Sequence, residues 1–212
     1  ESAFVTGGKT GAIEYSVAVN AQRFLRSESK DLYKFNQNNE ISGATLGLNE
    51  REFDQFTLAP KLSIEIDESR RLLIEPIYLR TKETRKDIKT PLKADLVTQE
   101  RVTDELRERV RETYGLYSGL EQELTHDMRL RFGIDWQQGS AETERNEIRF
   151  NTNGSINRER QRTEDIQLKS LRPELVLSIP LNDHDIAIGV EANSHSYDEN
   201  NGESTNGIPA QP

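Results

Sequence analysis

The residue types that most often do chemistry in proteins are few in this chain, and their spacing fits no known catalytic or metal-binding pattern. Three histidines occur, His126, His184 and His195, and no pair of them has the spacing of a zinc-binding helix. Cysteine is absent, and no G-x-S-x-G segment marks a nucleophilic serine. We therefore predict no catalytic or metal-binding residue and expect that the chain is not an enzyme.

Two short segments have the composition of ligand-binding loops but not their order. Gly7–Thr10 is superficially similar to a phosphate loop, yet the upstream glycine is missing and a strand pattern follows where a helix is needed. The acidic segment 198–203 lacks the ligand order and the final bidentate glutamate of a calcium loop. We expect no cofactor, and we interpret 198–203 as an ordinary loop.

The clearest pattern is an alternation of apolar and polar residues in Met128–Trp136, which predicts a strand with one apolar face. Tyr114–Leu124 becomes its partner if Thr125–Asp127 forms a three-residue hairpin loop. This register places opposite charges across from each other on the polar face and apolar residues across from each other on the other face. The polar-face pairs are Glu123 and Arg129, Glu121 and Arg131, and Gly119 and Gly133, and the apolar pairs are Leu120 and Phe132, and Leu116 and Trp136. We interpret its charges as a structural ladder rather than a ligand site.

Three further strand pairs follow from the same alternation. A turn over 6–11 precedes a strand over 13–22. A turn at 67–69 places Glu65 opposite Arg71 and Lys61 opposite Glu75, although it also places Pro60 opposite Pro76. A four-residue turn at 182–185 joins the last two strands, whose apolar residues share one face: Leu175, Leu177, Ile179, Leu181, Ile186, Ile188, Val190 and Ala192.

Long polar segments separate these pairs. We predict loops over 26–55, 81–112 and 140–165, the last with a turn at Asn151–Gly154, and an unstructured end over 198–212. For 81–112 a short amphipathic helix, a protruding strand extension and a disordered loop all remain possible.

The connections therefore alternate between short and long, which places all short turns at one end of a sheet and all long loops at the other. Outer-membrane barrels sort their connections in this way. The predicted fold is all-β, an antiparallel up-and-down meander of a transmembrane β-barrel. We expect seven to eight strands, with 1–212 a single segment of a larger barrel and no plug domain.

Composition excludes several classes of protein. The net charge of −9 argues against a nucleic-acid-binding surface, and no run approaches the ~20 apolar residues of a membrane-spanning helix. With 33% hydrophobic residues, the chain is polar for a compact core of 212 residues, whereas a one-sided sheet needs apolar residues at only half its positions. The absence of cysteine is compatible with export.

Several strand segments resemble those in the barrel domain of TonB-dependent outer-membrane receptors of Gram-negative bacteria. The segments that carry this resemblance are Leu58–Ser63, Leu73–Leu79, Leu130–Trp136 and Ile179–Gly189. The resemblance implies a barrel in the cell outer membrane, in contact with lipid and with the remaining strands and plug of a parent receptor. It also implies ligand uptake (siderophore, cobalamin or sugar) driven through the energy-coupling protein TonB.

Two alternatives remain open. A small outer-membrane barrel enzyme acting on lipids would need a catalytic Ser or His at a strand end, where only His195 is available. A soluble β-rich binding module would need another layer to cover its apolar face.

Overall fold

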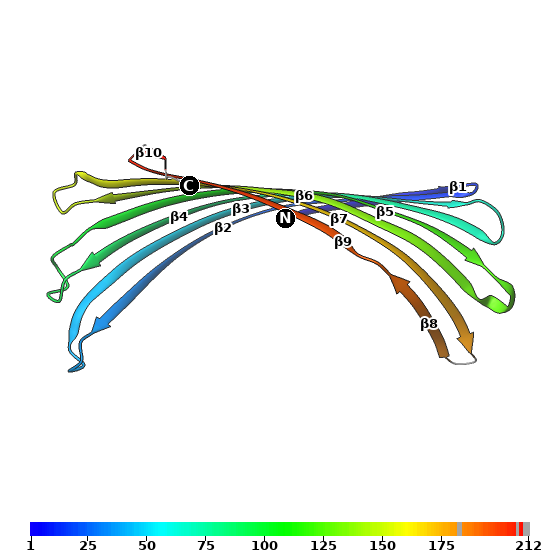
Figure 1. Ribbon diagram of the computed structural model, residues 1–212, viewed down its shortest axis with the longest axis horizontal. Coiled ribbons are helices and arrows are strands. Elements are labelled where there is room, and N and C mark those ends of the chain that lie inside the picture. The colour runs from blue at the N-terminus through cyan, green and yellow to red at the C-terminus, as the bar shows by residue number, and fades with distance from the viewer. Residues whose placement is uncertain (182–183, 207, 210–212) are drawn as a thin grey trace.

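The fold is a single antiparallel sheet of ten strands, seen in a computed structural model that describes residues 1–181, 184–206 and 208–209 (Figure 1). One short 3₁₀ turn, η1, spans Thr125–Asp127. The strands are β1 (Ser2–Thr10), β2 (Ile13–Phe35), β3 (Ile41–Glu65), β4 (Arg70–Leu92), β5 (Val102–Glu123), β6 (Arg129–Phe150), β7 (Ile156–Leu181), β8 (His184–Glu191), β9 (Ser194–Thr205) and β10 (Ile208–Pro209).

The strand order confirms the predicted all-β up-and-down meander. Strands β1 to β7 pair in sequence order, and β8 and β9 both pair with the free edge of β7. The predicted seven to eight strands correspond to β1 to β8, while β9 and β10 were not predicted. The described sheet is open, because β1 lies at one edge and β8 and β9 lie at the other.

The central register is as predicted. Glu121 pairs with Arg131, and Glu123 pairs with Arg129 across the β5–β6 hairpin. The backbone N–H of Leu124 donates to the carbonyl of Met128 at 2.8 Å, which closes the hairpin around η1. The turn at 67–69 is confirmed too, since Glu65 pairs with Arg71.

The three predicted long loops are wrong in extent. Most of 26–55, 81–112 and 140–165 belongs to paired strands, and only 36–40, 93–101 and 151–155 lie between strands. Of the possibilities for 81–112, the structure selects the strand extension. The polar residues form strands because they also alternate, and because each extension finds a partner of equal length whose backbone groups it satisfies.

The sorting of the connections is nevertheless confirmed. We call the end with connections 11–12, 66–69 and 124–128 the proximal end, and the end with 36–40, 93–101 and 151–155 the distal end. The distal turns lie together at the left of Figure 1. All described strand pairs are antiparallel, so the described turns from β1 to β7 alternate between the two ends.

Three smaller predictions need correction. Most of the turn predicted over 6–11 belongs to β1, and the chain reverses at Gly11, whose positive φ of 58° suits glycine. Part of the predicted four-residue turn, 182–183, lies outside the described residues, while His184 and Asp185 already pair within β8. The end predicted to be unstructured forms β9, which pairs with β7 as far as Thr205.

Prolines account for two interruptions of the sheet. The pairing of β3 with β4 stops after Leu58 and resumes at Leu62, around the facing pair Pro60 and Pro76. Neither proline has an N–H to donate. At the second site the N–H of Ala192 donates to the carbonyl of Pro173 at 3.1 Å, but Pro173 cannot return the bond, and β8 and β9 separate there.

The sheet has no conventional core within the described residues. Ala44 is the one hydrophobic residue there that is buried, whereas many large apolar side chains are exposed. No described helix combines the length and the apolar character required to span a membrane.

Candidate functional site

The two faces of the sheet differ chemically. We call the face with Leu120, Phe132 and Leu175 the band face, and the face with Gly119 and Gly133 the ladder face. In the proximal half the band face carries a continuous apolar band across the strands. Its members are Ile13, Tyr15, Val17, Val19, Leu58, Leu62, Ile64, Leu72, Ile74, Leu116, Leu120, Phe132, Ile134, Leu171, Leu175, Leu177, Ile188 and Val190.

Aromatic side chains mark the distal border of the apolar band. The ring centroids of Phe56 and Tyr78 are 6.2 Å apart, and those of Tyr78 and Tyr114 are 5.0 Å apart. Both tyrosine hydroxyls donate to the carboxylate of Glu112 at 3.3 Å, one step further toward the distal end. The rings therefore lie on the apolar side of the border and the hydroxyls on the polar side, which suits side chains with an apolar body and a polar tip.

Beyond this border the same face becomes acidic. Its distal half carries the carboxylates of Glu50, Glu52, Asp54, Asp104, Glu108, Glu142, Glu144, Glu159 and Asp165. The apolar band therefore occupies only the proximal half of the strands.

On the ladder face, a tyrosine lies across two glycines in the proximal half. A Cβ on either Gly119 or Gly133 would come within 2.7 Å of the Tyr117 hydroxyl, so the ring occupies the space that two side chains would otherwise fill. The Tyr117 hydroxyl donates to Glu174 at 3.2 Å, and Arg131 lies 3.4 Å from the same carboxylate. Arg131 thus pairs with β7 rather than with Glu121, its neighbour in the register.

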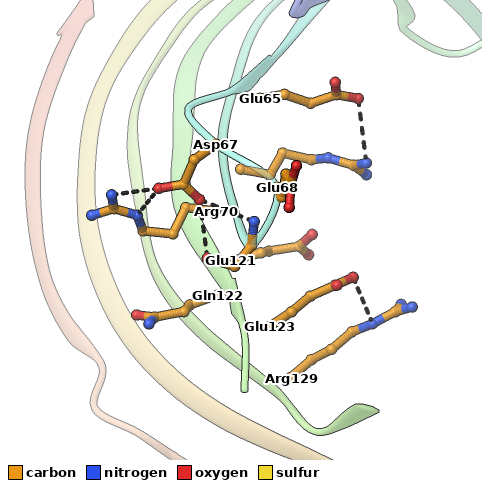
Figure 2. A pocket seen from close by; sticks show the side chains of 10 residues that line it. Glu65, Asp67, Glu68, Arg70, Glu121, Gln122, Glu123 and Arg129 are labelled. Atoms are coloured by element: carbon orange, nitrogen blue, oxygen red, sulfur yellow. Dashed lines mark hydrogen bonds and ion pairs between the residues drawn. The ribbon is translucent and has the colours of Figure 1, made fainter. Parts of the chain in front are cut away.

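A pocket of about 370 Å³ lies at the proximal end of the β3–β4 and β5–β6 hairpins (Figure 2). Its lining comprises Glu65, Asp67, Glu68, Ser69, Arg70, Arg71, Glu121, Gln122, Glu123 and Arg129. Arg71 lies 3.9 Å from Glu65, and Arg129 lies 3.8 Å from Glu123. Each hairpin therefore has an ion pair between predicted partners next to its turn. In the central hairpin this pair is Glu123 and Arg129.

Asp67 organises the turn inside this pocket. The Arg70 guanidinium donates to its carboxylate at 2.7 Å, and the backbone N–H of Ser69 donates to it at 3.0 Å. These two donors lower the pKa of Asp67 from 3.8 to about 2. Because each of its three arginines is already paired with an acid of the same lining, the pocket has the character of a structural cap.

Arginines form a row across the distal half of the ladder face. One arginine from each of six consecutive strands stands directly opposite the next, which is the arrangement we call the arginine row. Its members, from β2 to β7, are Arg26, Arg51, Arg85, Arg107, Arg145 and Arg162. With strands ~4.8 Å apart, the row extends about 24 Å across the sheet.

Nearby acids on the same face compensate most members of the arginine row. Arg51 lies 2.8 Å from Glu83, and Arg85 lies 2.7 Å from Asp87. Three more pairs join Arg26 to Glu28 at 3.3 Å, Arg145 to Glu105 at 2.8 Å and Arg162 to Glu203 at 2.9 Å. Asp87 and Glu105 are buried, so the ladder face is the more crowded of the two.

The exception lies on β5, in the middle of the sheet. Arg107, Arg109 and Arg111 follow one another on the ladder face, and no ion pair to any of them occurs among the described residues. The Nε of Arg109 is buried without a hydrogen-bond partner there. Opposite Arg109 stands Thr143, which is 8% exposed and whose hydroxyl is also buried and unpartnered among these residues.

The residues weighed for chemistry in the sequence do not come together. His126 lies in η1, His184 begins β8, and His195 lies on the exposed edge strand β9 opposite Ser170. Gly7–Thr10 lies within β1, and 198–203 lies within β9 instead of a loop. Within the described parts of the chain, no group of three or more His, Asp or Glu side chains is arranged to hold a metal ion.

The arginine row was not predicted from the sequence, because the segments that carry it were interpreted as loops. The signal was nevertheless present, since Arg107, Arg109 and Arg111 alternate with other residues, and so do Arg158, Arg160 and Arg162. Alternate positions share one face of a strand. One face of the sheet is therefore basic although the net charge of the chain is negative.

Comparison of the chain with protein-family models, with curated proteins and with solved structures finds no match.

Proposed function

We propose that this chain is a segment of an outer-membrane β-barrel that takes part in TonB-dependent uptake of a ligand. In this proposal the band face contacts lipid in its proximal half, and the ladder face lines the interior. The parent receptor supplies the remaining barrel strands and the plug.

One observation carries the membrane part of the proposal: the apolar band ends at a row of aromatic residues on the same face. An outer-membrane barrel carries an apolar band about 25 Å tall, bounded by aromatic side chains at the membrane interface. The Tyr78 and Tyr114 hydroxyls, directed to Glu112 beyond the band, fit such an interface. Without lipid, these exposed apolar side chains would favour aggregation.

Strand length supports the same interpretation. Crossing the apolar layer takes about 9–11 residues, whereas β3 and β7 have 25 and 26 residues. The surplus lies at the distal end, where charged residues stand on both faces. In barrels of this kind the longer connections face outward from the cell and the short turns face the periplasm.

The open edges support a larger barrel. Among the described residues, β1 pairs only with the proximal part of β2, and β9 has no partner on its outer side other than the short β10. Unpaired strand edges do not occur within the lipid layer, because their backbone groups would have no partners there. Further strands are therefore needed at both edges.

The uptake function rests on the resemblance of the strands to TonB-dependent receptors. Deletion of the parent gene should abolish growth on one ligand of this class, and restoration of the gene should rescue it. Growth that is unchanged on siderophores, cobalamin and sugars would contradict this part of the proposal.

The membrane part is tested by one substitution at two sites of β6. Ile134 and Ile148 lie on the same face, Ile134 inside the apolar band and Ile148 beyond it between Asp104 and Glu159. Ile134→Arg should cost about 2–4 kcal/mol of folding free energy in lipid vesicles, because the charge enters the apolar layer. Ile148→Arg should cost less than about 0.5 kcal/mol, because the two flanking carboxylates attract the new positive charge.

Denaturant titration of the parent protein in vesicles measures both effects. Equal and small losses would contradict a lipid-facing band. Stability of the protein as a monomer without detergent or lipid would favour the alternative of a soluble β-rich module.

A further inference from the structure

We propose that Arg107, Arg109 and Arg111 of β5, with Arg85 and Arg145 beside them, form a binding site for a small soluble multivalent oxyanion, a ligand bearing two or more phosphate or carboxylate groups. The inference rests on the proposed function, in which this face lines the barrel interior, and it names the chemical class of the ligand.

Register brings the five guanidinium groups into one patch. The three β5 residues occupy successive positions on one face, about 7 Å apart. Arg85 and Arg145 pair with Arg107 from the neighbouring strands, about 5 Å away on either side. Arginine presents donors in a planar fork that suits carboxylate and phosphate, and several forks at these distances match a ligand with several anionic groups.

The three β5 arginines differ from the other members of the arginine row, because no carboxylate forms an ion pair with them among the described residues, whereas Arg85 and Arg145 are paired with Asp87 and Glu105. Arg26, Arg51 and Arg162 each have a carboxylate within 3.3 Å. Within the described residues the β5 arginines have no such partner, and the one acid opposite Arg109 on β4, Glu83, is engaged by Arg51. Like charges placed opposite one another are destabilising, so an anion bound here would relieve a repulsion that the fold leaves in place.

Buried polar atoms point to the same place. The Nε of Arg109 and the hydroxyl of Thr143 lie opposite each other, both buried and unpartnered among the described residues. A buried polar group without a partner costs free energy, and a bound oxyanion could accept from both. The residues that pair with Arg111 on the two neighbouring strands, Thr81 and Ala141, are small.

Electrostatics of Arg109 agree with this geometry. Burial is the main cause that lowers its pKa, and the nearby charges of Arg111 and Arg107 lower it further, while the carboxylates of Glu164, opposite Thr143 on β7, and of Glu83 act in the opposite direction. A bound anion would act in the opposite direction and favour the charged guanidinium. The acidic band face of the same strands and the net charge of −9 disfavour long polyanions such as nucleic acid, which would contact more than this patch.

The experiment is a calorimetric titration of the parent protein in an uncharged detergent, with inorganic tripolyphosphate and citrate as probes. Wild type is compared with Arg109→Gln, Arg109→Lys and the triple variant Arg107→Gln, Arg109→Gln, Arg111→Gln. Arg80→Gln is the matched control, because it removes the same charge from the band face, where Arg80 lies 3.4 Å from Glu112. Circular dichroism checks that every variant is folded.

We expect saturable binding of at least one probe, weakened about tenfold or more by Arg109→Gln and abolished in the triple variant. Arg109→Lys should retain part of the affinity because the charge remains, and Arg80→Gln should change the dissociation constant less than about twofold. Binding should weaken as salt is raised.

A flat titration of folded wild type, or an equal effect of Arg80→Gln and Arg109→Gln, would overturn the inference. Binding of only an anionic short-chain lipid, tested in the same detergent, would assign the patch to headgroups and would also overturn it. The proposed membrane function is judged separately by Ile134→Arg in vesicles, so a failure of the anion site can be told apart from a failure of the membrane function.

Discussion

At the scale of single residues, Tyr117 shows how a flat sheet surface is filled without bulky neighbours. Its ring covers Gly119 and Gly133 on two strands, and its hydroxyl reaches Glu174 on a third. The two glycines therefore serve as space for one aromatic side chain, and the three central strands are joined by contacts beyond their backbone hydrogen bonds.

Gly133→Ala should destabilise the fold by about 1–3 kcal/mol, because the added methyl group would displace the Tyr117 ring and its bond to Glu174. Gly139→Ala is the matched control on the same face of β6, where the nearest atom would lie at 3.6 Å. That change should be neutral or stabilising by up to about 1 kcal/mol. Urea titration followed by the fluorescence of Trp136, the single tryptophan, measures both, and equal effects would contradict the role of Tyr117.

The turn at Asp67 should respond to acid. Its pKa is about 2 when folded against an ordinary 3.8, so ionised Asp67 favours the folded turn. This stabilisation is complete above pH 3.8 and is lost as the pH falls from 3.8 through about 2. Asp67→Asn should therefore be less stable than wild type at neutral pH, and the two should converge near about pH 2. A constant difference across this range, in urea titrations, would contradict the assignment.

Residue-level contacts could be predicted from the sequence only where two strands suffice to define them. The pairs at 121 and 131 and at 123 and 129 follow from one hairpin and were predicted correctly. The ion pair of Arg131 with Glu174 joins strands separated along the chain by the whole distal turn, and no local pattern specifies that register.

At the scale of elements, prolines decide where pairing stops. Strand β7 continues past Pro173, but its partner on that edge divides into β8 and β9. The registers of the two pieces agree, because Glu174 pairs with Glu191 and Leu171 pairs with Ser194. Strands β8 and β9 are therefore separated by a missing hydrogen bond and not by a change in strand direction.

Pro173→Ala should restore that bond. The new N–H at 173 would donate to the carbonyl of Ala192, whose own N–H already donates to residue 173. Hydrogen exchange at Ala192 and Ser194 should slow by about fivefold or more, which corresponds to roughly 1 kcal/mol. Pro180→Ala is the control, because alternation of the bonds directs position 180 away from β8 and adds no bond there. Similar protection in both variants would exclude this explanation.

The extensions of the strands were missed for a physical reason. Prediction of strands relied on apolar alternation, and the distal halves alternate between two kinds of charge instead. Segment 103–111 places Glu105 and the β5 arginines on one face and Asp104 and Glu108 on the other. Such a segment forms a strand because its neighbours supply opposite charges and backbone partners, and neither is visible in a single window of sequence.

At the scale of the whole molecule, the two ends of the sheet should lie on opposite sides of a membrane. Cysteine is absent, so single-cysteine variants report position without background labelling. In intact cells, Asn38→Cys and Asn153→Cys should react with a membrane-impermeant maleimide, because both lie in distal turns. Glu68→Cys, in a proximal turn, should react only after lysis. Labelling of all three in intact cells, or of only one distal position, would contradict the orientation.

The order and direction of the strands could be predicted from the sequence, whereas many details of the sheet surface could not. Short turns with matched alternation gave the antiparallel order and the sorting of connections, because each depends on neighbours in sequence. The arginine row depends on six registers at once, so it became visible only when every strand had been placed.

The up-and-down order has a consequence for how such a sheet assembles. Each hairpin closes a short loop before its strands first meet, so little chain entropy is lost and pairing can advance from one edge, hairpin after hairpin. The same locality allows a whole hairpin to be inserted or deleted while every other pairing is kept. Evolution can therefore widen or narrow a sheet of this design in units of two strands, and growth would break the fewest existing pairs at the edges formed by β1 and β9.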